Sequence, residues 1–328
     1  MNGSRASAPA LLDDLVRLAP PDARRAGPVT VLKETRVLVV RVGDVVVKAH
    51  QPGTDEAWLR ARLGVAQELP EVMLAPLALE WLDGGSPHGG RLVTIWPAGV
   101  ALSPDDLNEA DDLDRADGRD GGRDGGRDGG GAPWEEGGRL LARLHAHPPP
   151  TGLPPAGGPA RVAGAVAGLA EVGLPSRVLA PIRAAYGTLP PFPFSAPAGK
   201  RAPRLTHGDW HLGQLVEHRG RWLLIDPDDL GVGDPAWDLA RPAAWFAAGL
   251  LEPDAWDRFL SAYLAAGGTA VSARDPWREL DLPARALTVQ LAATAVAAAA
   301  RAGDPLDDAA TAMLSSCERI AATARSRT

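Results

Sequence analysis

The sequence predicts an α+β protein with two lobes, a small antiparallel β-sheet lobe with one helix followed by a larger, mainly helical lobe. Three observations support this fold class. Three β-branched runs stand close together between residues 29 and 50, and a Gly-rich segment interrupts the chain between residues 111 and 133. Stretches rich in Ala and Leu with helical periodicity then dominate the second half.

The first lobe is predicted from its strand and turn signals. Residues 29–50 read "VTVLKETRVLVVRVGDVVVKAH", and Val and Thr favour extended chain, so we expect an antiparallel meander with a turn at Gly43 and Asp44. A further strand is predicted over residues 91–99, ending at Pro97 because proline cannot donate to a sheet ladder.

One helix is expected between these strands. Thr54 stands where it can cap the helix, and the acids that follow it suit the positive end of the helix dipole. Trp58, Ala61, Val65 and Leu69 recur at helical spacing, so we expect them to form its buried face.

The expected organisation is a β-rich lobe at residues 1–97, a flexible linker region at 98–133 and a helical lobe at 134–328. Within the linker region Gly-Arg-Asp-Gly recurs from Gly118, Gly122 and Gly126, with almost no apolar side chains to offset the entropy of ordering it. A calcium-binding repeat is less consistent with this pattern, since such repeats need regularly spaced apolar residues. In the last region, a short helix is predicted in residues 134–150, "WEEGGRLLARLHAHPPP", where the prolines end it. Further helical stretches are predicted at residues 162–189, 243–251, 256–265, 284–302 and 309–324.

Composition restricts the partners and the compartment. The chain has 328 residues, a formal net charge of −7 and a pI near 5.5. Because nucleic-acid binding depends on clustered Lys and Arg, we expect no nucleic-acid partner, and a small or cationic substrate fits better. The single cysteine, Cys317, favours a reducing compartment and a packing role for its thiol. No pattern indicates an oligomeric state.

Neither the N-terminus nor the apolar runs predict a membrane protein. Asp13 and Asp14 stand where a signal peptide needs an apolar region. The run at residues 286–300 is shorter than the roughly 18 residues of a membrane span and consists largely of Ala, so we expect a buried helix there. A cytoplasmic protein without a membrane partner is the resulting expectation.

Candidate functional residues cluster in residues 205–239, "LTHGDWHLGQLVEHRGRWLLIDPDDLGVGDPAWDL". Asp209 and Gln214 flank a tight loop, and the apolar strand from Arg221 delivers Asp226 at its end. Oxygen ligands in this pattern suit a hard cation such as Mg²⁺, which binds through one or two carboxylates and shares its shell with phosphates. Asp209 would then orient an attacking hydroxyl and accept its proton.

Other acids of this stretch compete for the metal. Asp228 and Asp229 are alternatives to Asp226, which strand alternation and delivery at the end of the strand favour. Asp234 and Asp238, in "GDPAWDL", are interpreted as a helix-start cap and a loop brace.

Two histidines next to Asp209 admit a second interpretation. His207 and His211 could be zinc ligands, but no third nitrogen or sulfur ligand follows at a suitable spacing, and Gly208 favours a loop over a zinc-binding helix. We therefore expect His207 to brace the loop and His211 to be structural.

The segments "HGDWHLGQ", "IDPDD" and "GDPAWDLA" together resemble the catalytic segment of the aminoglycoside phosphotransferase and choline-kinase branch of the protein-kinase-like superfamily. The resemblance covers nearly the whole chain in order and is strongest in the second half. It implies a protein-kinase-like bilobal fold. By this resemblance Asp209 is the catalytic base, and Gln214 and Asp226 are the metal ligands.

The resemblance also assigns a nucleotide site in the first lobe. Lys48 would grip the α- and β-phosphates of ATP, and Glu56 would orient Lys48. Thr94, Ile95 and Trp96, with Pro97, would form a hinge whose backbone meets adenine. Gln214 stands where the family usually has Asn. Maltokinase-like members, whose loop is similar, also have Gln at this position.

These residues predict a Mg·ATP-dependent phosphotransferase that phosphorylates a hydroxyl of a small molecule, such as an aminoglycoside, an amino sugar or another sugar-like acceptor. Gln214 and the lack of a Gly-rich phosphate loop keep a nucleotide-binding pseudokinase, acting as a scaffold or sensor, as the alternative. A metal-dependent hydrolase built on the His and Asp residues is a third hypothesis. The acceptor itself stays open among antibiotics, amino sugars, disaccharides and amino alcohols.

Overall fold

The computed structural model describes residues 8–82, 90–102, 132–194 and 202–326. The chain divides into two compact units. Unit 1 comprises Met1–Ala101 with Leu215–Asp228, and unit 2 comprises Leu102–Gln214 with Asp229–Thr328. The chain thus returns to unit 1 after residue 214, whereas the sequence predicted boundaries at residues 97 and 133. The Gly-Arg-Asp-Gly repeats lie outside the described residues.

A five-stranded antiparallel sheet forms the centre of unit 1, in the order β1-β2-β3-β5-β4. The strands are β1 (Val29–Glu34), β2 (Leu38–Val42), β3 (Val45–Ala49), β4 (Ala78–Leu82) and β5 (Arg91–Pro97). The predicted meander and the end of the last strand at Pro97 are confirmed. Gly43 turns the chain with φ +57°, and a Cβ there would lie 2.3 Å from the carbonyl oxygen of Ala23.

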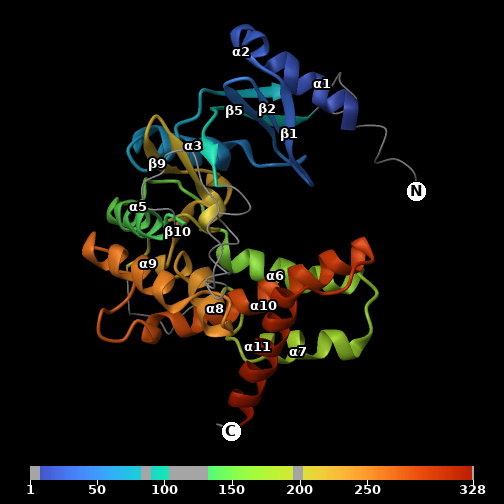
Figure 1. Ribbon diagram of the computed structural model, residues 1–328, viewed down its shortest axis with the longest axis vertical. Coiled ribbons are helices and arrows are strands. Elements are labelled where there is room, and N and C mark those ends of the chain that lie inside the picture. Colours follow the sequence, from blue (N-terminus) through green and yellow to red (C-terminus); the bar gives the residue numbers. More distant parts are fainter. Residues whose placement is uncertain (1–7, 83–89, 103–131, 195–201, 327–328) are drawn as a thin grey trace, which may run out of the picture. The chain divides into compact units, whose positions relative to one another are not determined.

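Helices cover both faces of the sheet, because apolar side chains of its strands point to each face in turn. Helices α1 (Ala8–Leu18) and α2 (Pro21–Ala26) bury Leu15 and Ala23 against Val40 and Val47 on one face (Figure 1). On the other face, α3 (Glu56–Glu68) packs Leu59, with Leu63, against Leu92 and Trp96. Lys48 alternates with Val47 along β3, so its side chain belongs to the α3 face.

Helix α3 differs in detail from its prediction. Asp55 caps it, because its Oδ1 accepts a hydrogen bond from the backbone N–H of Trp58 at 2.9 Å. The hydroxyl of Thr54 instead donates to the carbonyl of Gln51 at 2.8 Å. The predicted buried face is also wrong in part. Trp58 is 49% exposed, and the buried face of the helix is centred on Leu59.

A hairpin from the second half of the chain completes unit 1. Strand β6 (Val100–Ala101) pairs with β8 (Leu215–His218), which pairs with β9 (Arg221–Leu224). The hairpin is also joined to the segment before β4, because Leu74 N–H donates to the carbonyl of Leu224 at 2.9 Å and Leu224 N–H donates to that of Val72 at 2.9 Å. These backbone bonds explain why residues 215–228 belong to unit 1.

Unit 2 consists mainly of helices around one long central helix, α10 (Trp277–Ala302). Its neighbours are α6, α7, α8 and α11 (Figure 1). Helices α5 and α9 pack on each other. The bounds are α5 Trp134–Ala146, α6 Gly158–Gly168, α7 Ser176–Tyr186, α8 Ala240–Ala248, α9 Pro253–Ala265 and α11 Asp308–Arg325.

Alanine allows α10 to pack closely on several sides. Val289 and Val296 of α10 join Ile182 of α7 and Cys317 of α11 in one apolar cluster. By length and composition α10 could cross a membrane, but 61% of its apolar window is buried inside the structure, as in the core helix of a folded domain. The expectation of a buried helix is confirmed.

A short pair of strands in unit 2 holds the loop that carries Asp209. Strand β7 (Arg204–Thr206) pairs antiparallel with β10 (Gly231–Gly233). The loop begins after Thr206 and ends in a single 3₁₀ turn, η2 (Leu212–Gln214), where Gln214 N–H donates to the carbonyl of His211 at 2.8 Å. The sequence thus places Asp209 on a short connection that is anchored at both ends.

Candidate active site

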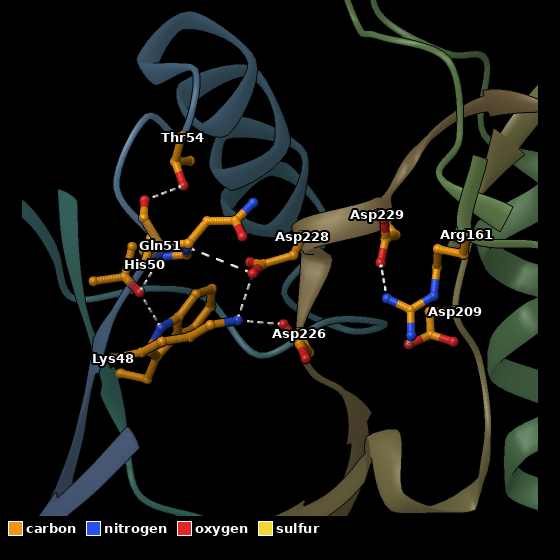
Figure 2. Close-up of polar contacts among 11 residues, drawn as sticks. Lys48, His50, Gln51, Thr54, Arg161, Asp209, Asp226, Asp228 and Asp229 are labelled. Carbon is orange, nitrogen blue, oxygen red and sulfur yellow. Dashed lines mark hydrogen bonds and ion pairs between the residues drawn. The ribbon is translucent and has the colours of Figure 1, made fainter. Parts of the chain in front are cut away.

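In unit 1, the ammonium of Lys48 is held by two carboxylates. Nζ donates to Oδ1 of Asp226 at 2.5 Å and to Oδ2 of Asp228 at 2.7 Å (Figure 2). His50 completes this Lys48 cluster, with its Nδ1 3.5 Å from Oδ2 of Asp228. The Lys48 side chain is only 11% exposed, so these two bonds replace most of its hydration.

Burial and charge act in opposite directions in the Lys48 cluster. Burial alone would lower the pKa of Lys48, but the carboxylates of Asp226 and Asp228 outweigh it and raise that pKa above its usual range. Burial alone would raise the pKa of Asp228, but the charge of Lys48 and the hydrogen bond from His50 hold it below its usual range. The cluster therefore contains a charged ammonium and a charged carboxylate at neutral pH.

The backbone of Asp226 adopts a conformation that side chains rarely take. Its φ is +60°, in the left-handed region, which Asp tolerates better than most residues. The predicted strand ends earlier than expected, because β9 stops at Leu224 and Asp226 lies two residues beyond it. The 3₁₀ turn η3 (Pro227–Asp229) begins immediately after Asp226. The bend between strand and turn brings both Asp226 and Asp228 to the same lysine.

A buried hydrogen-bond chain runs beside Lys48. Nε1 of Trp96 donates to Oγ1 of Thr94 at 2.9 Å, and that hydroxyl lies 3.0 Å from Nε2 of His50. Thr94, Ile95 and Trp96 are interior residues of β5 and pair with β3, and Thr94 and Ile95 also pair with β4. Their backbone groups are thus engaged in the sheet, and a hinge backbone free to meet adenine would have to follow Pro97.

Glu56 has a different partner from the one that the sequence suggested. Its carboxylate accepts from Arg60 one helical turn later, at 2.8 Å. Among the described residues the partners of the Lys48 ammonium are Asp226 and Asp228. The structure therefore does not bring Glu56 and Lys48 together.

In unit 2, two arginines grip the carboxylate of Asp209. Nη2 of Arg241 donates to Oδ1 at 2.7 Å, and Nη2 of Arg161 lies 2.8 Å from Oδ2. The second amino group of Arg161 donates to Oδ2 of Asp229 at 2.8 Å (Figure 2). We refer to Asp209, Asp229, Arg161 and Arg241 as the Asp209 cluster.

Asp238 braces the loop before Asp209. Its Oδ2 accepts from the backbone N–H of His207 at 2.6 Å, and its Oδ1 accepts from that of Gly208 at 2.8 Å. Nε2 of His145 lies 2.9 Å from Oδ2 of Asp238, and both side chains are buried. The brace fixes the backbone from which Asp209 projects.

Gly208 is required by the tight packing of this loop. Its φ is +86°, and a Cβ there would lie 2.1 Å from the carbonyl oxygen of Asp229. His211 accepts a hydrogen bond from the N–H of Gly213 on its Nδ1 at 3.1 Å, and Asp234 caps the 3₁₀ turn η4 (Pro235–Trp237) through the N–H of Ala236 at 3.0 Å. His207 is fully buried.

The candidate metal ligands offer only oxygen donors. Asp226 supplies a carboxylate and Gln214, which is 6% exposed, supplies an amide carbonyl, a donor set that fits a hard cation. Within the parts of the chain that the structure describes, no three His, Cys, Asp or Glu side chains form a group suited to a metal. Of the three neighbouring acids, Asp226 and Asp228 both bind Lys48, whereas Asp229 binds Arg161.

Three residues of these clusters were not predicted from the sequence: Arg161, Arg241 and His50. One signal could have identified the two arginines. Arg161 lies in the first turn of α6 and Arg241 in the first turn of α8, where the helix dipole disfavours a cation. A cation at such a position requires nearby anions, and the aspartates of residues 205–239 are the available ones.

Comparisons agree with this fold. The sequence matches the profile of the Phosphotransferase enzyme family over residues 34–280. No curated protein gives a significant match to the sequence. Amicoumacin kinase hAmiN in complex with AMP-PNP, Ca²⁺ and Ami has a TM-score of 0.58 and 15% identity, with 98% of this chain and 94% of that chain covered.

Two further solved structures have the same fold. A choline/ethanolamine kinase family protein from Mesorhizobium loti has a TM-score of 0.56 and 16% identity, with 96% of this chain and 98% of that chain covered. A thermostable mutant of an aminoglycoside phosphotransferase, in a ternary complex with AMP-PNP and hygromycin B, has a TM-score of 0.53 and 14% identity, covering 92% and 95%.

The structural likeness confirms the predicted fold class, and the profile match spans both the Lys48 cluster and the Asp209 cluster. The chain therefore belongs to the phosphotransferase enzyme family and is a small-molecule kinase that transfers a phosphoryl group to a hydroxyl.

Proposed function

We propose that this kinase uses Mg·ATP to phosphorylate a hydroxyl of an aminoglycoside, an amino sugar or another sugar-like acceptor, with Asp209 as the base. The observation that carries the proposal is the placement of Asp209 on a loop whose backbone is fixed by Asp238, within the region matched by the family profile. Related folds are solved with AMP-PNP and with hygromycin B or Ami bound, which supports a nucleotide donor and a small acceptor.

The chemistry requires little covalent participation by the protein. The acceptor oxygen forms a bond to the γ-phosphorus, the bond from that phosphorus to the β–γ bridging oxygen breaks, and ADP leaves. Asp209 accepts the hydroxyl proton and orients the attacking oxygen. Lys48 would neutralise charge on the α- and β-phosphates.

The donor set described above suits magnesium, which would neutralise charge on the transferring phosphates when bound. We propose Asp226 and Gln214 as its protein ligands. The Gln amide offers the same carbonyl oxygen as the Asn that the family usually has, on a longer stem.

The test is ADP formation by the purified chain with Mg·ATP and a panel of antibiotics, amino sugars, disaccharides and amino alcohols. Asp209→Asn should lower turnover by roughly 10²- to 10⁴-fold, because a neutral amide cannot take the proton, while nucleotide affinity changes little. Asp304→Asn, at an exposed loop position, serves as the matched control.

Turnover of Asp209→Asn at the wild-type rate would remove Asp209 from its role. Nucleotide binding that does not depend on Mg²⁺, together with no ADP formation for any acceptor, would instead favour a nucleotide-binding scaffold.

A further inference from the structure

The carboxylate of Asp209 binds one guanidinium on each of its two oxygens. Arg241 reaches Oδ1 and Arg161 reaches Oδ2, at 2.7 and 2.8 Å. A single hydrogen bond would leave a carboxylate free to rotate about its own axis. Two bonds from different helices, α8 and α6, fix the plane of the carboxylate and leave its other lone pairs available as acceptors.

Holding these two arginines in place is energetically costly. Both lie in the first turn of a helix, where the dipole opposes a cation. Arg241 is also only 14% exposed, and burial together with the charge of Arg161 lowers its pKa despite the attraction of Asp209. Its Nε is buried with no hydrogen-bond partner among the described residues. An arrangement that serves stability alone would be better with neutral side chains.

Arg161 also connects Asp209 to the turn that follows Asp226. Its Nη1 donates to Asp229, the last residue of η3, which begins directly after Asp226. The backbone of the same turn is held too, because Gly157 N–H donates to the carbonyl of Asp229 at 2.8 Å. The direction of the Asp209 carboxylate is therefore coupled to the position of this turn.

We propose that Arg161 and Arg241 are positioning residues of phosphoryl transfer, which fix the Asp209 carboxylate so that its remaining lone pairs meet the acceptor hydroxyl. The inference rests on the proposed function of Asp209. Small displacements of an aligned group are costly in a reaction that depends on positioning, so loss of one clamp reduces the chemical step while leaving nucleotide binding intact.

The experiment compares Arg161→Gln, Arg161→Lys and Arg241→Lys with the wild type. ADP formation is measured with the acceptor of the panel that stimulates it most; if no acceptor raises it above the rate of ATP hydrolysis, that hydrolysis rate is compared instead. Arg161→Gln should lower kcat by roughly 10- to 100-fold with little change in KM for ATP. Arg161→Lys should recover part of the loss, since an ammonium restores the charge without binding both aspartates at once. Arg177→Gln, an exposed arginine of α7, is the matched control.

The outcomes separate this inference from the proposed function. If Asp209→Asn is inactive while Arg161→Gln keeps the wild-type kcat, the positioning role is refuted and the proposed function stands. If Asp209→Asn is fully active, or if no condition yields ADP, both are refuted. Should Arg241→Lys fail to fold, Arg161 decides the matter, because its side chain is 41% exposed and thermal unfolding can show that its variants remain folded.

Discussion

Replacing Lys48 by Met should destabilise the protein and make its stability depend on divalent cations. Methionine keeps an apolar stem of similar length but removes the ammonium between Asp226 and Asp228. The two hydrogen bonds of 2.5 and 2.7 Å are lost, and two carboxylates then face each other without a cation. The 11% exposure of the Lys48 side chain means that water can replace little of what is lost there.

The magnitude follows from the burial of the partners. Removing one member of a buried ion pair costs about 3–5 kcal/mol. The Asp226 and Asp228 side chains are 29% and 32% exposed, so water solvates part of their charge in the variant and the cost falls to about 2–3 kcal/mol. At roughly 2–4 °C per kcal/mol, the melting temperature should fall by about 4–12 °C.

Thermal and urea unfolding of Lys48→Met, Lys33→Met and the wild type measure this loss. Lys33 is exposed on β1, so the same substitution there removes a charge without a buried partner. Added Mg²⁺ should recover more stability in Lys48→Met than in the wild type, because the carboxylates are no longer occupied by the ammonium. Equal melting temperatures for the two variants would refute the account of the Lys48 cluster.

Further predictions concern pH, the loop before Asp209 and the single thiol. The folded state lowers the pKa of Asp228, so this carboxylate contributes stability above its unfolded pKa of about 3.9, and that stability is lost as the pH falls. In acid unfolding, Lys48→Met should therefore lose less free energy of unfolding below this pH than the wild type does. Gly208→Ala should unfold at a lower temperature than Gly152→Ala, since φ is +86° and +85° respectively but only the first Cβ has atoms within 4 Å. Burial raises the pKa of Cys317 to about 12, so a thiol reagent should label it at neutral pH only after unfolding. The same shift stabilises the fold below the unfolded thiol pKa of about 8.5, and this contribution should fade in unfolding measurements as pH rises toward about 12.

Local patterns predicted those parts of the fold that local forces decide. The turn at Gly43 and the strand ending at Pro97 follow from backbone restrictions that no distant contact alters. Helix α3 was located but its buried face was not, because Leu59 and Trp58 are both apolar and only the position of the sheet decides which one is covered.

The candidate site was predicted where chemistry and short motifs coincide. Lys48 and Asp226 were identified separately, yet the bond between them spans 178 positions in the sequence, and only the fold brings them together. Strand alternation ranked Asp228 below Asp226 as a metal ligand. Asp228 nevertheless binds the same lysine, because the 3₁₀ turn η3 follows Asp226 and brings Asp228 back to Lys48. Thr94 was assigned to a hinge by the family resemblance, whereas its pairing with Lys48 of β3 places it inside β5.

The return of residues 215–228 to unit 1 limits how this kinase can be dissected. A fragment ending at Ala101 would lack β8 and β9, leaving the backbone of β6 and of Leu74 without its strand partners. Unpaired strand edges of this kind promote aggregation. Expression of the N-terminal region alone should therefore give insoluble material, whereas grafting the hairpin onto its C-terminus through a short turn should restore a folded unit 1.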